Sequence, residues 1–276
     1  MSDPVEKTFY YAARDGLVSE VTSLLRDHPE INVNWTNPHC EEWAALHVAS
    51  LFGHVEVIKL LLAHPKINVN SKNIDGQTPL SFGCQVGYVS VVEELLKDPH
   101  VDVTHDDNMG RTPLWYASRE GEHEVIEQLI ASGRDLGDVK NKKEKENMHR
   151  VYTALEIARE KNQTEVVFVL ERFLANPTQT GHEVRVKIGV LDALAAEIFA
   201  LTVFLCDDLL QLKSASHPAA ATRFFAMTKR LPMELQMLIC HRAVGSTKQN
   251  ILRKDSEVAF KSLARVLLLL ALSERH

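Results

Sequence analysis

The sequence predicts an all-α protein, in which a solenoid of stacked helical repeats precedes a smaller helical domain. Apolar and glycine positions recur every 34 residues in its first half. Each copy holds two short apolar segments with the period of an α-helix. The recurrence ends near Asn176, after which a helical period continues without it. We therefore expect a repeat domain at residues 5–175 and an α-helical C-terminal domain at 177–276, packed on or near the last repeat.

The composition is that of an ordinary globular protein. The chain has 276 residues, of which 45% are hydrophobic and 25% are charged, and its net charge is −6. DNA-binding domains are usually basic, so this balance disfavours a nucleic-acid partner. The N-terminus lacks the apolar core of a signal peptide, and charged residues interrupt the apolar runs. We expect a protein of the cytoplasm or the nucleus with no membrane segment.

The cysteines and histidines match no metal-binding or catalytic motif. The four cysteines have neither CxxC nor zinc-ligand spacing, and they are Cys40, Cys84, Cys206 and Cys240. Nucleotide-binding loops and the common hydrolase motifs are absent from the sequence. A structural role is more probable than a catalytic one for each of the 13 histidines. The sequence therefore predicts no enzyme, metal or cofactor.

The repeat is defined by positions that align three times. The aligned leucines, glycines and valines are Leu46, Leu80 and Leu114, then Gly53, Gly87 and Gly121, then Val57, Val91 and Val125. A glycine between two short helices suits a left-handed turn. The valines and the leucines that follow them form the apolar stripe of each second helix. One helix pair cannot bury such a stripe alone, so stacked neighbours must bury it together.

Short motifs within these copies resemble the ankyrin repeat. Thr78-Pro79-Leu80 and Thr112-Pro113-Leu114 match its TPL segment, Ala45-Leu46-His47 matches the residues that follow, and Gly53-His54 matches its turn. Threonine is expected to cap each first helix and proline to occupy its first turn. The resemblance implies that His47 bonds to the backbone of the adjoining hairpin. It also implies about five repeats, the outer two degenerate, and a scaffold that binds another protein.

The resemblance places partner contacts on the hairpin tips and the exposed edge of the first helices. The expected residues are Cys40, Trp43, Leu51, Phe52, Asp75, Gln77, Gln85, Met109, Arg111, Arg119, Arg150 and Tyr152. Aromatic and apolar residues begin this surface, and arginines end it, as suits hot spots. An alternative is that Trp43 and Phe52 pack against the degenerate first repeat. The first and fourth connections are longer than the others, and such insertions are either recognition loops or tolerated extensions.

The C-terminal region predicts helices and carries one further resemblance. Leu191, Leu194, Ile198 and Leu201 fall on one helical face, which we expect to be buried. The segment Leu231-Pro232-Met233-Glu234-Leu235 resembles the opening of an F-box. That resemblance implies a second hypothesis, a substrate adaptor that docks a Skp-type subunit of a cullin ubiquitin ligase. Proline and glutamate at the start of an ordinary helix are the alternative explanation.

Overall fold

The computed structural model describes residues 5–137, 139, 152–206, 233–244, 251, 255–256 and 258–259. The chain divides into two compact units, residues 1–181 and 182–276. Each unit is considered separately below.

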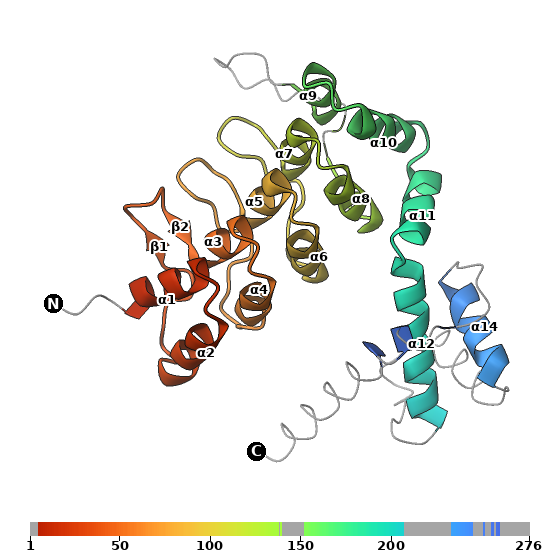
Figure 1. The fold of residues 1–276 in the computed structure, drawn as a ribbon, viewed down its shortest axis with the longest axis horizontal. Helices are drawn as coiled ribbons and strands as arrows, with labels where there is room; N and C mark the ends of the chain where they lie inside the picture. The colour runs from red at the N-terminus through yellow and green to blue at the C-terminus, as the bar shows by residue number, and fades with distance from the viewer. Residues whose placement is uncertain are drawn as a thin grey trace. The chain divides into compact units, whose positions relative to one another are not determined.

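The first unit is a stack of five helix–turn–helix repeats (Figure 1). The first helices of the repeats are α1 (Val5–Arg14), α3 (Ala45–Leu51), α5 (Pro79–Val86), α7 (Pro113–Glu120) and α9 (Ala154–Glu160). The second helices are α2 (Val18–Asp27), α4 (Val55–Leu62), α6 (Val89–Lys97), α8 (His123–Ala131) and α10 (Thr164–Ala175). First helices contact first helices of neighbouring repeats, and second helices contact second helices. The predicted all-α repeat fold of about five repeats is confirmed.

The loops before α3, α5 and α7 project from the same side of the stack (Figure 1). The first of them contains the only strands among the described residues, β1 (Thr36–Asn37) and β2 (Trp43–Ala44), which pair antiparallel. The extra residues of this connection turn the chain through Glu41 and Glu42, both with positive φ. The insertion in the first connection therefore forms the tip of a short hairpin.

The starts and ends of the helices follow the predicted residue chemistry. The hydroxyl oxygens of Thr78, Thr112 and Thr153 accept hydrogen bonds from backbone N–H groups in the first turns of α5, α7 and α9. The glycines at the turns between helices are left-handed, with φ of 78° at Gly53, 80° at Gly87 and 88° at Gly121. In the fifth repeat Asn162 takes this position with φ of 57°. Both predictions, the threonine caps and the glycine turns, are confirmed.

The core of the stack is the apolar stripe of the second helices. Its central members are at most 1% exposed, and they are Val57, Ile58, Leu61, Val91, Val92, Leu95, Val125, Ile126 and Leu129. Because these side chains lie between successive helix pairs, each repeat depends on its neighbours for the burial of its own stripe.

Polar side chains connect one repeat to the next. His47 Nε2 lies 3.0 Å from the carbonyl oxygen of Ser71, and its Nδ1 accepts a hydrogen bond from the Ala44 N–H. The predicted bond from this histidine to the adjoining hairpin is therefore confirmed. Asn34 and Asn70 each donate to a carbonyl and accept from an amide of the following repeat. These amides fix the spacing between repeats through paired hydrogen bonds.

The described part of the second unit contains the end of α11 (Pro177–Lys187), α12 (Val190–Cys206) and α14 (Met233–Ala243). Helices α12 and α14 contact each other. The predicted buried face of α12 is wrong in part, because Leu194 is 41% exposed whereas Ala195, Ala196 and Ala200 are fully buried. Alanines allow closer packing between helices, so the small residues of α12 form its inner face and a leucine lies outside. No helix in the described ranges is long and apolar enough to cross a membrane.

Candidate protein-binding surface

Equivalent residues at the ends of the first helices form a row across the stack. Successive repeats place Arg14, Leu51, Gln85, Arg119 and Glu160 at this position. The next position along the chain includes Phe52, which is 47% exposed, and Val86, which is 37% exposed. Repeats two and three thus expose apolar side chains at one edge of the first helices, and the fourth repeat places a cation, Arg119, at the end of α7.

Trp43 is mainly a packing residue. Its ring lies 4.9 Å from the Phe82 ring of the next repeat, measured between centroids. Its Nε1 is buried and has no hydrogen-bond partner among the described residues. Trp43 therefore packs toward the third repeat. Phe52 is 47% exposed and stacks on His54, whose Nε2 lies 2.8 Å from the Arg14 carbonyl oxygen of the first repeat.

The hairpin tips hold three of the expected residues. Cys40 is exposed as a free thiol, Asp75 is exposed, and Met109 is 50% exposed. Burial raises the pKa of Tyr10 above its ordinary value, and the neighbouring Cys40 shifts it further in the same direction. The backbone carbonyl of Asp75 accepts a hydrogen bond from the Asn108 N–H, so the tips of the third and fourth repeats are joined.

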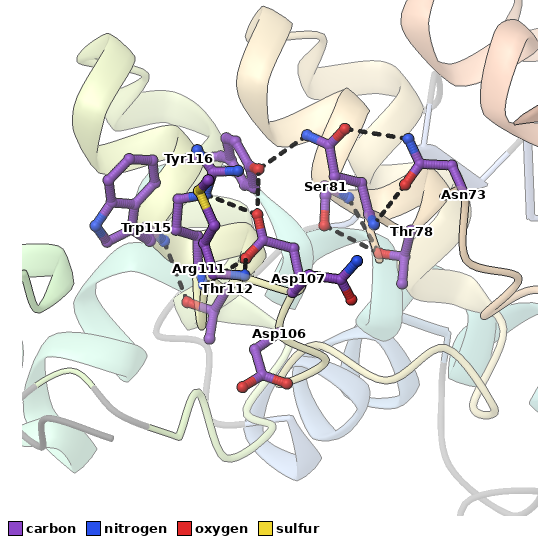
Figure 2. Close-up of polar contacts among 12 residues, drawn as sticks. Asn73, Thr78, Ser81, Asp106, Asp107, Arg111, Thr112, Trp115 and Tyr116 are labelled. Carbon is purple, nitrogen blue, oxygen red and sulfur yellow. Dashed lines mark hydrogen bonds and ion pairs between the residues drawn. The ribbon is translucent and has the colours of Figure 1, made fainter. Parts of the chain in front are cut away.

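Asp107 is the centre of a buried polar network in the hairpin loop that precedes α7, in the fourth repeat (Figure 2). Its carboxylate accepts hydrogen bonds from the backbone N–H groups of Met109 and Arg111, from Arg111 Nε at 2.7 Å and from the Tyr116 hydroxyl at 2.7 Å. Four donors, one of them the guanidinium of Arg111, compensate for the burial of this carboxylate, whose side chain is 0% exposed. The expected surface residue Arg111 therefore also has a structural role.

The network extends to the third repeat through Gln77. The Gln77 side chain donates to the Tyr116 hydroxyl oxygen at 2.8 Å, and its backbone N–H donates to Asn73. Burial raises the pKa of Tyr116 above its ordinary value, and the hydrogen bond to the Asp107 carboxylate acts in the same direction. The tyrosine is thus held as a neutral donor that connects the two hairpins. Gln77, like Arg111, is partly used for structure.

Trp115 belongs to this surface, although it was not among the expected residues. Its ring centroid lies 5.5 Å from the guanidinium carbon of Arg111 and 5.7 Å from that of Arg119. Trp115 and Arg119 are four residues apart on α7, a spacing that places them on one face of the helix, and Arg111 lies just before the cap of that helix. That pattern is visible in the sequence and would have identified Trp115.

The remaining expected residues are placed unevenly. Gln85 and Tyr152 are half-buried, whereas Arg150 lies outside the described residues. Of the F-box-like segment, Leu231 and Pro232 also lie outside the described residues, and Glu234 is described only in its backbone. Leu235 is 44% exposed at the start of α14. Among the described residues no group of histidine, cysteine and acidic side chains could hold a metal ion.

The comparison with known families agrees with this architecture. A family model of ankyrin repeats, in three copies, matches residues 9–107 and again residues 66–140. The repeats within residues 9–140 are therefore ankyrin repeats, and repeats of this class generally mediate protein–protein interaction. Repeats one to four lie largely within the matched residues, and the fifth continues the stack beyond them. No curated protein matches the chain.

Proposed function

We propose that this protein is a non-enzymatic scaffold that binds a partner protein through the hairpin tips and first helices of its ankyrin repeats. The observation that carries the proposal is the row Arg14, Leu51, Gln85, Arg119 and Glu160. These positions are equivalent in the repeat, yet they hold a cation, an apolar residue, an amide, a cation and an acid. A position that the fold needed would hold similar residues, so this variety suits recognition of one particular partner.

A differential capture experiment tests this proposal. The full chain and two variants are used as baits in a cell lysate, and the captured proteins are compared by quantitative mass spectrometry. Phe52→Glu places a charge in the exposed apolar edge, and we expect it to lose the partner. Ser90→Glu adds the same charge to an exposed position of α6 on the second-helix row, and it should retain the partner. Equal capture by both variants contradicts binding through the first helices.

A second candidate is that the C-terminal segment makes the protein a substrate adaptor of a cullin-type ubiquitin ligase. The observation that favours it is the exposure of Met233 and Leu235, at 59% and 44%, at the start of α14. Exposed apolar side chains on one helix could enter a groove of a Skp-type adaptor. Purified Skp-type adaptor should bind the full chain and lose affinity when Leu231 and Pro232 are both replaced by alanine. This candidate function is contradicted if the double alanine variant binds the adaptor as well as the original chain does, or if the original chain does not bind it.

We also propose that the α-helical C-terminal domain, residues 177–276, covers the exposed side of the last repeat. The observation behind this proposal is that α10, the last helix of the stack, has no following repeat and carries an apolar side chain, Phe168, on its surface. End repeats of solenoids need a cover for their apolar side.

The free thiols of Cys40, Cys84 and Cys240 suit the reducing conditions of the cytoplasm or the nucleus, where we place the protein. A fluorescent fusion of the full chain would locate it.

A further inference from the structure

The fourth repeat carries two guanidinium groups beside one indole. Arg111 precedes the cap of α7, Trp115 lies in its first turn and Arg119 in its last turn. Both guanidinium carbons lie within 6 Å of the Trp115 ring centroid, at 5.5 and 5.7 Å. Cations at this distance from an aromatic face are attracted to it, which restricts their side-chain rotamers. The two arginine side chains are thereby partly ordered before any partner binds. We call these three residues the Arg111–Trp115–Arg119 cluster.

The cluster has more donors than acceptors. Arg111 Nε donates a hydrogen bond to Asp107, and Arg119 Nε forms an ion pair with Glu120 at 2.8 Å. Within the part of the chain that the structure describes, no hydrogen bond from the terminal nitrogens of either arginine is found, and Trp115 Nε1 is buried without a partner. The Asp107 carboxylate already accepts four hydrogen bonds. A partner group that pairs with the terminal nitrogens of the two arginines must be an acceptor, as a carboxylate is.

The repeat itself does not require this arrangement. The third repeat has Gln77, Ser81 and Gln85 at the three equivalent positions. The fifth repeat replaces Trp115 and Arg119 by Glu156 and Glu160. Helices α5 and α9 form and stack with these neutral or acidic residues in place. The two arginines and the tryptophan are therefore specific to the fourth repeat and are not needed to form its first helix.

We propose that the Arg111–Trp115–Arg119 cluster binds a carboxylate of an acidic side chain on the partner protein. This inference rests on the proposed scaffold function and names the chemistry of one contact. Arg111 and Arg119 are paired with Asp107 and Glu120 through Nε, so their terminal nitrogens can still donate to an acidic partner segment, whereas the net charge of −6 disfavours its docking elsewhere on the chain. Arginine forms paired hydrogen bonds with carboxylates, and tryptophan and arginine are the residues most enriched in binding hot spots. The contact thus fixes where an acidic segment can dock along the stack.

A random peptide library displayed on phage tests the inference without a known partner. The full chain, its Arg119→Glu variant and its Arg26→Glu variant serve as parallel baits. Arg26 is a matched control, because it pairs with the adjacent Asp27 at 2.9 Å as Arg119 pairs with Glu120, and it lies on the second helix α2. We expect the full chain and Arg26→Glu to enrich the same peptides with an aspartate or glutamate at a fixed position, and Arg119→Glu to fail to enrich them.

The enriched peptide is then synthesised with its acidic residue, with glutamine and with phosphoserine at that position. The dissociation constant should rise at least about tenfold with glutamine, and the original peptide should bind Arg119→Glu equally weakly. If the phosphoserine peptide binds more tightly than the acidic peptide, the preferred ligand is a phosphate, and the inference of a carboxylate is overturned. Enriched peptides without an acidic position, or equal binding to both arginine variants, would also overturn it and leave the scaffold function standing. A library that yields no binder contradicts the scaffold function itself.

Discussion

His47 Nε2 lies 3.0 Å from the carbonyl oxygen of Ser71 and 3.2 Å from that of Gln77, so one buried ring joins the second repeat to the hairpin of the third. Its Nδ1 accepts a hydrogen bond from the Ala44 N–H at 3.0 Å. A ring that accepts at Nδ1 and donates at Nε2 is neutral. The joint between these repeats therefore depends on the protonation state of one side chain.

This dependence predicts an acid-sensitive stability. Burial lowers the pKa of His47 from 6.5 to about 4 in the folded protein, although its two backbone contacts oppose the shift. Below pH 6.5 the unfolded chain binds a proton at His47, whereas the folded chain binds this proton only below about pH 4. The free energy of unfolding should therefore fall as the pH drops through this window, by about 3 kcal/mol from this group.

Urea denaturation at a series of pH values measures this contribution. His47→Gln should flatten the dependence on pH between 6.5 and 4 relative to the original chain. His39 is exposed near the tip of the first hairpin, so His39→Gln serves as the control and should leave the slope unchanged. The same slope in the original chain and in His47→Gln would show that this ring does not control acid stability.

The polar network predicts a structural role for one hydroxyl. Tyr116→Phe removes the donor to Asp107 and the acceptor for Gln77 while it keeps the buried ring. Since a buried carboxylate loses one of its donors, the free energy of unfolding should fall by about 1–3 kcal/mol. Tyr88 is 38% exposed, so Tyr88→Phe should change it by less than about 0.5 kcal/mol. Comparable urea midpoints for the two variants would contradict the importance of the network.

Much of the fold could be predicted because the repeat uses local chemistry. Thr78 and Thr112 cap helices through residues only three positions away, and such short-range contacts are visible in a sequence. The surface was harder to predict. Trp43 and Trp115 both lie near the start of a first helix, but one ring packs on Phe82 of the next repeat and the other lies beside two guanidinium groups. The contact between Trp43 and Phe82 recurs one period later as the hydrogen bond between Gln77 and Tyr116, so the period relates the positions but not the chemistry of the residues that occupy them.

The turns between helices predict a substitution that distinguishes backbone strain from crowding. Gly121 has φ of 88°, and a Cβ there would lie within 3 Å of the Gln163 side-chain amide. Gly121→Ala should therefore destabilise the stack by about 1–2 kcal/mol through the left-handed backbone. Asn162 holds the equivalent place in the fifth repeat with φ of 57°, so asparagine is tolerated there. Gly121→Asn should be the less damaging variant in thermal melting. If asparagine is worse than alanine, crowding by Gln163 dominates.

Deletion of residues 190–276 tests the proposed cover of the last repeat. Helix α10 contacts α8 and α9 within the stack and leaves Phe168 60% exposed. If the C-terminal domain shields this side, the truncated chain should melt at a lower temperature and self-associate in size-exclusion chromatography, because an exposed apolar end promotes aggregation. Phe168→Ser in the truncated chain should then reduce self-association, since it removes the exposed ring. A truncated chain that remains monomeric with an unchanged melting temperature would show that the repeats need no cover.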